Sequence, residues 1–380
     1  MISFELSKEQ KRLQDKFHKI AEFEIRPLAI DMDKKLPGPI DPSFLRILAN
    51  NNLNALIIPR EYGGKAVDSV TLALIEEELA WGSVDFISII NATFHALMTI
   101  LIGGSKEQKS KFLPMMLSPA GAVASFCSTE EKSGSDSSSY STLARFKNDR
   151  YILDGQKNPI VNAGDSLFNI VWANLENQKD RSGINAFIVP ATTKGISIGP
   201  FHDKSGFRGM PAAMVSFSGA SIPKNNLIGV PGSGYLLLMQ VVDWGRAIAG
   251  ATSVGLARAA VEEALGYAKT RLIKKRPIIS NQGVSFILSE LTTQLAAARL
   301  LVWKACRLID LGLDYTAAAS MAKLFASELA VRAATEGMLI LGHKSYFRPS
   351  LMEKLLRDSQ LSRIIEGTSQ IQKIIIANQL

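Results

Sequence analysis

The spacing of apolar residues changes twice along this chain of 380 residues, and these changes limit the fold more than any other feature. In the first part, apolar residues such as Leu13, Phe17 and Ile20 recur every three or four positions, which is typical of amphipathic helices. Short apolar or alternating runs between turn residues then indicate strands, and long helical periods follow. The predicted α+β domains are an N-terminal α-helical domain at 1–120, a middle antiparallel β domain at 121–232 and a C-terminal four-helix bundle at 233–380.

Local signals place the elements inside these domains. Ser7 and Ser105 stand at the start of helical periods, with Gln10 and Gln108 three positions later, a pattern that caps helices. No helical period separates the expected strands, so a parallel βαβ sheet is not expected. Helices are expected at 45–56, 69–101, 105–117, 235–271, 281–311, 316–341 and 350–376, and strands at 122–127, 140–146, 151–153, 167–173, 184–189 and 212–217.

Composition narrows the class of protein. With 47% hydrophobic and 21% charged residues, the chain is expected to fold rather than remain disordered. Cys127 and Cys306 are the only cysteines, which excludes a disulfide framework, and four histidines at no ligand spacing argue against a built-in metal site. The formal net charge of +8 comes from no dominant basic block. It fits an anionic small ligand at least as well as nucleic acid, and no nucleic acid partner is expected.

The sequence also predicts where the protein works. No apolar run is expected to reach the roughly 18–20 residues that a membrane helix needs, so no membrane partner is expected. The N-terminus has an acidic residue, Glu5, early on and no apolar core stretch, so it is not expected to be a signal peptide. We therefore expect a reducing, cytoplasmic compartment.

Glu366 gives the strongest chemical signal. It lies in 364–372 (IIEGTSQIQ), where a helical pattern is interrupted and then begins again. A carboxylate beside a glycine at such a break can reach into a cleft, and Thr368 or Ser369 can cap the following helix. In an apolar cleft its pKa would rise from about 4.3, which suits a general base. A surface glutamate at a helix join is the competing interpretation.

A second polar segment, 126–136 (FCSTEEKSGSD), follows the first expected strand. Its hydroxyls and backbone N–H groups could hold a ring system or a phosphate, although a solvated serine-rich loop explains the same residues. The segment 232–234 (GSG) does not join a strand to a helix in a βαβ unit, so it does not indicate a dinucleotide fold. His95 is expected at the edge of the core.

Short motifs in a shared order make the chain resemble the acyl-CoA dehydrogenase family nearly end to end. Each motif is modest alone, but their order and spacing are specific, and they favour Glu366 as a functional residue. The motifs are 58–64 (IPREYGG), 104–109 (GSKEQK), 128–130 with 133–136 (STE and SGSD), 204–208 (KSGFR), 357–358 (RD) and 365–368 (IEGT).

The resemblance implies an activity and a set of site residues. The family binds FAD between the β domain and the bundle, usually in a homotetramer, and turns an acyl thioester of CoA or of a carrier protein into the trans-enoyl thioester. Glu366 would remove the α-proton, the flavin would take the β-hydride, and an electron-transfer flavoprotein would accept the electrons. The backbone N–H of Glu366 would bind the thioester oxygen. FAD would contact Phe126, Ser128, Thr129, Ser135, Thr368 and Gln370, with Arg271 and Gln282 reaching the FAD of a neighbouring subunit, and the substrate would contact Ser135, Asp243, Arg246 and Gly367.

Several positions depart from the family pattern around the flavin. Pro159 stands where the family has an aromatic residue, and Val161 where it has a threonine hydroxyl. One lost hydrogen bond costs about 0.5–1.5 kcal/mol, so several losses together would weaken FAD binding by orders of magnitude. Lys274 and Lys275 would instead strengthen FAD binding, because they add cations near the expected path of the pyrophosphate. Further departures are Leu339 and His343, for a glutamine and a glycine, Glu131 for a proline and Ile365 for a tyrosine.

Two other functions therefore stay open. A flavin-poor protein on the same scaffold could use Glu366 for non-redox α-proton chemistry, as a lyase, hydratase or cyclase. A degenerate subunit could instead support an active paralogue in a hetero-oligomer, with 271–275 facing the partner's cofactor. The sequence does not specify the acyl length and shape, CoA versus carrier protein, the electron acceptor or the pathway.

Overall fold

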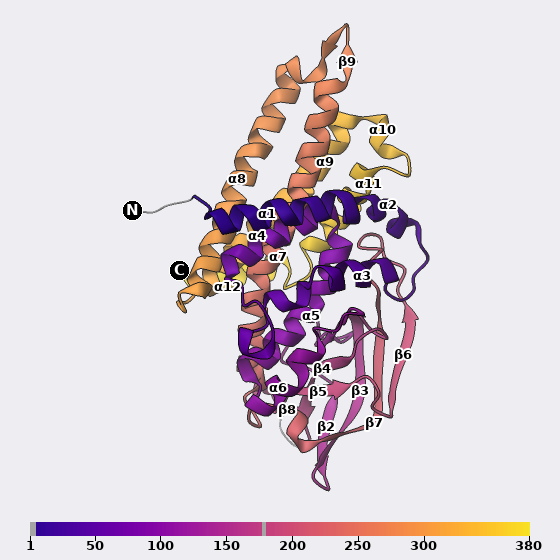
Figure 1. Cartoon of the computed structure of the whole chain (residues 1–380), viewed down its shortest axis with the longest axis vertical. Coiled ribbons are helices and arrows are strands. Elements are labelled where there is room, and N and C mark those ends of the chain that lie inside the picture. Colours follow the sequence, from indigo (N-terminus) through magenta and orange to yellow (C-terminus); the bar gives the residue numbers. More distant parts are fainter. Residues whose placement is uncertain (1–4, 177–179) are drawn as a thin grey trace.

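The computed structural model describes residues 5–176 and 180–380 and contains a helical part, a sheet and a bundle of long helices (Figure 1). Ser7 and Ser105 cap helices as predicted. Each hydroxyl accepts a hydrogen bond from the backbone N–H of the glutamine three residues later, and the side chain of that glutamine accepts one from the backbone N–H of the serine. The first part contains α1 (Lys8–Ile20), a π-helical turn (Ala21–Ile25), α2 (Arg26–Lys34), α3 (Pro42–Asn50), 3-10 turns at Leu53–Leu56 and Arg60–Tyr62, α4 (Ser69–Gly82), α5 (Val84–Gly103) and α6 (Lys106–Met115).

The middle part forms an eight-stranded sheet within the described residues, in the order β6–β7–β3–β2–β4–β5–β8 with β1 beside β4. Most pairs are antiparallel, as predicted, but β1–β4 and β2–β4 are parallel. The sequence missed β6 because Gly199 and Pro200 interrupt its apolar pattern, and β8 because it has only two residues. The strands are β1 (Ser125–Cys127), β2 (Leu143–Lys147), β3 (Arg150–Val161), β4 (Phe168–Leu175), β5 (Ile184–Pro190), β6 (Ile196–Phe201), β7 (Ala212–Pro223) and β8 (Leu227–Ile228), with 3-10 turns at Asp180–Gly183 and Lys224–Asn226.

The last part is the predicted bundle. Its fourth expected helix is two helices, because the chain turns through Glu366 and Gly367, which have φ values of 55° and 85°. A short hairpin, also missed, projects at the far end of α7 and α8 (Figure 1). The elements are α7 (Gly234–Thr270), β9 (Leu272–Ile273), β10 (Arg276–Pro277), a 3-10 turn (Ile278–Ser280), α8 (Gln282–Asp310), α9 (Thr316–Leu341), α10 (His343–Tyr346), α11 (Leu351–Ser362) and α12 (Ser369–Ala377).

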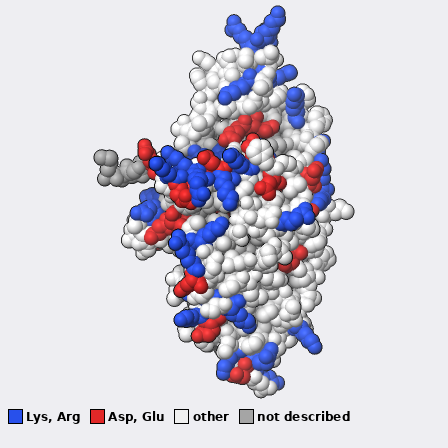
Figure 2. Space-filling view, in the orientation of Figure 1, with Lys and Arg blue, Asp and Glu red and all other residues white. Residues whose placement is uncertain are grey.

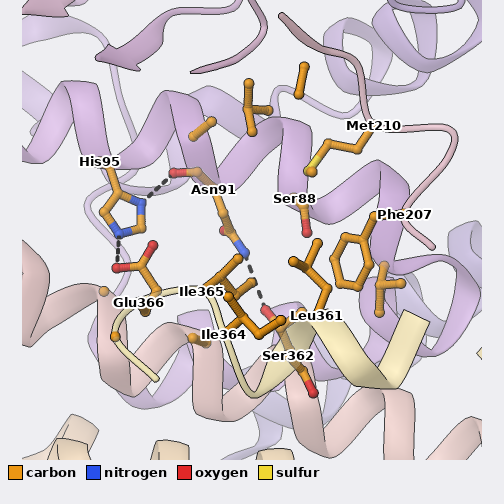
Figure 3. A pocket seen from close by; sticks show the side chains of 18 of the residues that line it. Ser88, Asn91, His95, Phe207, Met210, Leu361, Ser362, Ile364, Ile365 and Glu366 are labelled. Carbon is orange, nitrogen blue, oxygen red and sulfur yellow. Dashed lines mark hydrogen bonds and ion pairs between the residues drawn. The ribbon is translucent and has the colours of Figure 1, made fainter. Parts of the chain in front are cut away.

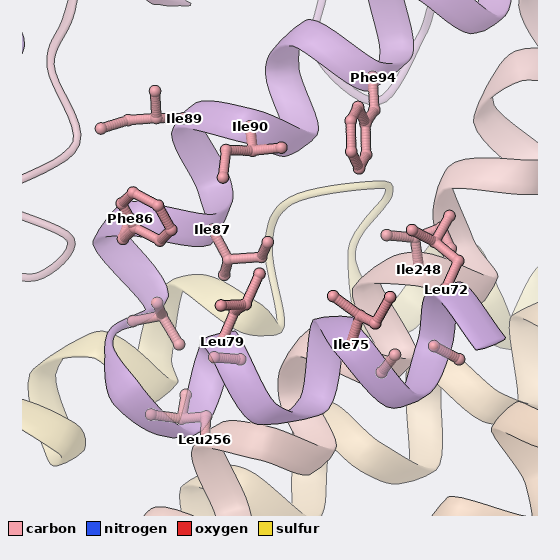
Figure 4. Close-up of a cluster of buried hydrophobic side chains, with 14 of the residues drawn as sticks. Leu72, Ile75, Leu79, Phe86, Ile87, Ile89, Ile90, Phe94, Ile248 and Leu256 are labelled. Carbon is pink, nitrogen blue, oxygen red and sulfur yellow. The ribbon is translucent and has the colours of Figure 1, made fainter. Parts of the chain in front are cut away.

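The main core lies where α4, α5 and α7 cross (Figure 4). Residues such as Ile75, Ile87 and Ile248 are at most 1% exposed there. By length and composition α5 could cross a membrane, so the prediction that no apolar run reaches that length is wrong. However, 67% of its apolar window is buried inside the fold, and a helix that is apolar on all sides is typical of the core of a large protein.

Two motifs that are about 150 residues apart in sequence meet beside this core. The backbone N–H of Phe207 donates to Oδ1 of Asp358 at 2.7 Å, and Arg357 Nη1 donates to the carbonyl of Ser205 at 2.7 Å. A Cβ on Gly206 would lie 2.6 Å from the carbonyl oxygen of Arg357, so only glycine allows this approach. The contacts attach α11 to the sheet domain and thereby position the turn that carries Glu366.

Candidate active site

A cavity of about 440 Å³ lies between the sheet, α5, α7 and the turn that joins α11 to α12. All three parts of the chain contribute to its walls, with Phe126 from β1, His95 from α5, Gly245 from α7 and Glu366 from the turn. Figure 3 shows the His95 and Glu366 side chains on one side of this space and Phe207 and Met210 on the other. The cavity therefore exists only in the assembled fold.

The turn at Glu366 is held by its carbonyl groups. Gln372 Nε2 donates to the carbonyls of Glu366 and Gly367, at 2.9 and 2.8 Å, and the buried Lys323 Nζ donates to the carbonyl of Gly367 at 2.8 Å. Thr368 caps α12 by accepting from the N–H of Ile371. Because the backbone is fixed in this left-handed turn, the Glu366 side chain lies against the cavity, with 24% of its surface exposed.

His95 is the partner of Glu366 that sequence analysis placed only at the core edge. Its Nε2 lies 3.2 Å from Oε2 of Glu366 (Figure 3). Its Nδ1 lies 2.7 Å from the carbonyl oxygen of Asn91, and since a carbonyl only accepts, Nδ1 carries a hydrogen. The Nε2–carboxylate contact is then favourable only when a proton lies between the two groups. Burial lowers the pKa of His95, but Glu366 and the Asn91 carbonyl outweigh burial and raise it.

The predicted rise in the pKa of Glu366 is wrong. Burial does act to raise it, but His95, Arg246 and Lys323 outweigh burial and lower the pKa of this carboxyl below its ordinary value. The sequence prediction considered an apolar cleft, whereas these cations come from α5, α7 and α9. Glu366 is therefore ionised at neutral pH.

Gly245 allows α7 to approach this pair. A Cβ at that position would lie 2.2 Å from His95 Nε2 and 2.9 Å from Glu366 Oε2. The next residue, the buried Arg246, forms an ion pair with Asp243, whose second oxygen accepts from the hydroxyl of Thr316 at 2.9 Å. Asp243 and Arg246, predicted to bind substrate, thus lie together near Glu366, but neither is among the residues that line the cavity.

The predicted cofactor loop contributes three of its four named residues. Phe126, Thr129 and Ser135 line the cavity. Ser128 does not line it, because its hydroxyl bonds the hydroxyl of Tyr140 instead. The prediction that Ser128 contacts the flavin or the substrate beside it stays a prediction.

Glu130 holds that loop on the sheet. It pairs with the fully buried Lys157 at 2.8 Å and accepts from the backbone N–H groups of Ser141 and Thr142. Burial opposes ionisation of Glu130, but Lys157 and the surrounding hydrogen bonds outweigh it and hold the pKa of the carboxyl at about 2. Within its motif, this glutamate stabilises the loop rather than facing a ligand.

The two departures in the flavin wall do line the cavity. Pro159 and Val161 present apolar surface, while the hydroxyls of Thr129 and Ser135 have no hydrogen bond to a described residue. A Cβ on Gly134 would meet nothing within 4 Å, so space is open there as well. Apolar walls with unpaired hydroxyls at the edge fit a flat ring system that carries polar atoms at its rim, which is the character of a flavin.

The remaining predicted contacts divide into two groups. Gly367 and Thr368 line the cavity, whereas Gln370, Arg271 and Gln282 are exposed and do not. Arg271 follows the last residue of α7, about 39 Å along that helix from Gly245 at 1.5 Å per residue. Within one chain it cannot reach the cavity, and the prediction that Arg271 and Gln282 reach a neighbouring subunit stays a prediction.

Lys274 and Lys275 lie at the tip of the β9–β10 hairpin, where Lys and Arg mark the extreme end of the molecule in Figure 2. On the rest of the face shown, acidic and basic groups are interspersed. The two lysines are far from the cavity of their own chain, so any cofactor they contact belongs to another subunit.

Family models cover nearly the whole chain. The N-terminal domain of acyl-CoA dehydrogenase matches residues 7–119, the middle domain matches residues 125–220 and the C-terminal domain matches residues 232–380. An acyl-CoA dehydrogenase of Bacillus subtilis is 36% identical over 377 residues, which is 99% of this chain and 98% of that protein.

Solved structures agree with these models. Butyryl-CoA dehydrogenase from Megasphaera elsdenii matches with a TM-score of 0.95 and 30% identity over 100% of this chain and 99% of that one. An acyl-CoA dehydrogenase from Bacillus anthracis, solved in complex with FAD, matches with a TM-score of 0.92 and 27% identity over 100% of this chain and 68% of that one.

These matches confirm the predicted fold class and the predicted enzyme class, an oxidoreductase, and the FAD complex confirms the cofactor expected for the family. They run from the first capped helix to the end of the bundle. The chain belongs to the acyl-CoA dehydrogenase family.

Proposed function

We propose that this protein catalyses the α,β-dehydrogenation of an acyl thioester, with Glu366 as the base that removes the α-proton. The observation that carries the proposal is the Glu366 carboxylate, which a left-handed turn fixes against a cavity shared by the sheet and the bundle. A general base must be ionised and within reach of the proton that it takes. The lowered pKa of Glu366 meets the first condition.

Backbone and imidazole groups complete the site. The backbone N–H of Glu366 donates to no described residue, so it is available to the thioester oxygen, where negative charge develops as the α-proton leaves. His95 Nε2 lies beside the carboxylate that receives the proton. When Glu366 gains the α-proton it becomes neutral, so the net charge of the Glu366–His95 pair rises by one and His95 loses the negative charge that raises its pKa.

Phe126, Pro159 and Val161 would hold FAD by apolar contact, and Thr129 and Ser135 by their hydroxyls. When bound, FAD accepts the hydride equivalent that leaves the β-carbon. We further propose a homotetramer in the cytoplasm, a CoA or carrier-protein thioester as substrate and an electron-transfer flavoprotein as acceptor.

The first experiment measures the absorption spectrum and the flavin-to-chain ratio of the purified protein, before and after reconstitution with FAD. Acyl-CoA thioesters are then added without oxygen, and loss of flavin absorbance is followed in the wild type and in Glu366→Gln. We expect bound flavin that loses its absorbance only in the wild type. A protein that cannot be loaded with FAD under any condition would contradict the proposal.

Non-redox α-proton chemistry is the second candidate, favoured by Pro159 and Val161 in the cavity wall. It predicts that flavin-free protein exchanges the α-hydrogen of a thioester with deuterated water and that Glu366→Gln abolishes the exchange. Exchange without flavin loading would support this candidate, whereas exchange only in the loaded enzyme would support the dehydrogenase.

A further inference from the structure

Polar side chains line the cavity beyond the Glu366 end, where a plain hydrocarbon chain would need only apolar contacts. Ser88 and Asn91 come from α5, and Thr252 and Ser253 from α7. Asn91 precedes His95 by four residues, so it lies about 6 Å further along the helix. Figure 3 shows Ser88 across the cavity from His95 and Glu366, next to Phe207 and Met210.

A buried glutamate from a third helix stands behind these residues. Glu76 of α4 is 1% exposed. Its Oε2 accepts from Asn91 Nδ2 at 3.1 Å and from the Thr252 hydroxyl at 3.2 Å. Asn91 Nδ2 also donates to the Thr252 hydroxyl at 3.2 Å. The three side chains therefore form one polar cluster, the Glu76–Asn91–Thr252 cluster, against the apolar core.

The Glu76–Asn91–Thr252 cluster is incomplete. Oδ1 of Asn91 and Oε1 of Glu76 are buried and have no hydrogen-bond partner in the described part of the chain. Buried polar atoms in native proteins nearly always have such a partner. Asn91 lines the cavity, so a molecule within the cavity can supply the missing partner.

The charge of the cluster indicates which group that partner carries. Glu76 has no ion-pair partner among the residues of 5–176 and 180–380. Burial raises its pKa to about 8, against the hydrogen bonds from Asn91 and Thr252 and the charge of His95. Lys204 is a cation that lines the cavity, but it donates to the carbonyl of Met210 at 2.5 Å and not to the cluster. An acidic acyl group placed at the cluster would therefore face acceptor oxygens and no ion-pair partner from the cluster. The Asn91 carbonyl oxygen accepts hydrogen bonds, so the complementary group is a donor.

Building on the dehydrogenase function above, we propose that the acyl chain of the substrate carries a hydroxyl or amino group beyond the bond that is oxidised. This group donates a hydrogen bond to Asn91 Oδ1 and lies against the Thr252 hydroxyl, with Glu76 behind both. The inference names a substrate class, a donor-bearing acyl thioester, and it distinguishes this chain from one that oxidises plain fatty acyl thioesters.

The test uses matched thioesters of CoA with acyl chains of four to six carbons, ending in a hydroxyl, an amine or, at equal length, a methyl group. We expect kcat/KM of the FAD-loaded enzyme to be at least tenfold higher for a hydroxyl or amine member than for its methyl match. The hydroxyl and amine arms decide which donor is used. A methyl member that equals or exceeds both of them at every length overturns the proposal.

Binding provides a readout that does not need turnover. Calorimetric titration of Glu366→Gln with the same thioesters is expected to show at least tenfold tighter binding of the donor-bearing member. If no thioester is oxidised but this preference is found, the dehydrogenase proposal fails and the substrate class stands. If the thioesters are oxidised with no preference in either assay, the dehydrogenase proposal stands and the proposed substrate class fails.

Two variants test whether the Glu76–Asn91–Thr252 cluster causes the preference for donor-bearing thioesters. Thr252→Val and Asn91→Leu should each lower the ratio of kcat/KM between donor-bearing and methyl thioesters tenfold or more. The matched control is Thr99→Val on α5, whose hydroxyl likewise bonds the carbonyl four residues earlier but which does not line the cavity. It should leave the ratio unchanged. Equal losses on both thioesters in Thr252→Val would overturn the assignment.

Discussion

Two carboxylates near one cavity, Glu366 and Glu76, have opposite electrostatic surroundings. Glu366 lies in a left-handed turn, faces His95 and has Arg246 and Lys323 nearby, and its pKa is lowered. Glu76 lies inside α4, its hydrogen-bond donors among the described residues are an amide and a hydroxyl, and its pKa is raised to about 8. One is ionised and the other neutral at pH 7, although the fold covers most of the surface of both side chains.

The difference separates two roles. An ionised carboxylate can accept a proton, whereas a neutral carboxyl can donate one or share hydrogen bonds, and enzymes commonly assign acid–base roles by such contrasts. The comparison teaches that burial alone does not decide the pKa of a glutamate in this fold. The cations that packing brings to each carboxyl decide it.

The largest expected effect comes from replacing each carboxylate by its amide. Glu366→Gln should lower the rate of α-proton removal by about a hundredfold to ten-thousandfold, the usual contribution of a general base. Glu76→Gln keeps its hydrogen bonds to Asn91 and Thr252 and should lose less than about tenfold on a methyl-terminated thioester. Rapid-mixing measurements of flavin absorbance check both rates. Equal losses of rate in the two variants would contradict the separate roles of Glu366 and Glu76.

The next largest effect is the contribution of Glu76 to the pH dependence of stability. Its pKa rises from 4.5 to about 8 in the fold, so between these pH values the native chain holds a proton that the unfolded chain has released. The free energy of unfolding must then fall as pH rises through this range, by on the order of 4 kcal/mol for this group, and level off above it. Denaturant unfolding from pH 5 to 9 should show that Glu76→Gln removes this fall and Glu366→Gln keeps it.

His95 should set the pH at which Glu366 becomes active. Burial alone would raise the pKa of Glu366, and His95 opposes it together with Arg246 and Lys323. In His95→Leu the carboxyl should gain its proton at higher pH, so the acid limb of kcat/KM should move to higher pH.

A second histidine–glutamate pair provides the control for this shift. His18 Nδ1 lies 2.8 Å from Glu78 Oε2, away from the cavity. His18→Leu should leave the acid limb in place. Movement of the limb in both variants, or in neither, would show that His95 does not tune the base.

The smallest effect concerns the backbone turn. Gln372→Leu removes the donors to the carbonyls of Glu366 and Gly367, although Lys323 still binds the second one. We expect the free energy of unfolding to fall by about 1–3 kcal/mol because the partly buried carbonyl of Glu366 loses its partner, and kcat to fall severalfold with the pH profile unchanged. Gln379→Leu, an exposed change just beyond the same helix, is the control. A normal kcat in Gln372→Leu would show that the turn needs no such support.

Much of the fold could be predicted from local patterns in the sequence. Ser7 and Ser105 cap helices because a hydroxyl and a glutamine three residues apart satisfy the same helix end whatever surrounds them. The break at Glu366 was visible because glycine and threonine interrupt a helical period. Strand β6 was missed because its pairing to β7 overrides the glycine and proline within it.

The site was predicted less completely, for a related reason. His95, Asn91 and Glu76 stand in helices whose period looks like ordinary core, and a polar residue at a core position was their only signal. Ser128 was named from a motif, but its hydroxyl is used by Tyr140, which is 12 residues away in sequence.

The sequence by itself determined the order of helices and strands and the helix caps, because these depend on residues that are near one another in the chain. It also pointed to Glu366 as the residue proposed to be the base, through the order of motifs along the chain. Only the tertiary structure decided that Glu366 is ionised and Glu76 is neutral. The cations around Glu366 come from three helices, whereas the hydrogen bonds to Glu76 from described residues come from Asn91 and Thr252, and these together with the charge of His95 do not offset its burial. Electrostatic energy depends on distance in space, and distances between separate helices are set by packing.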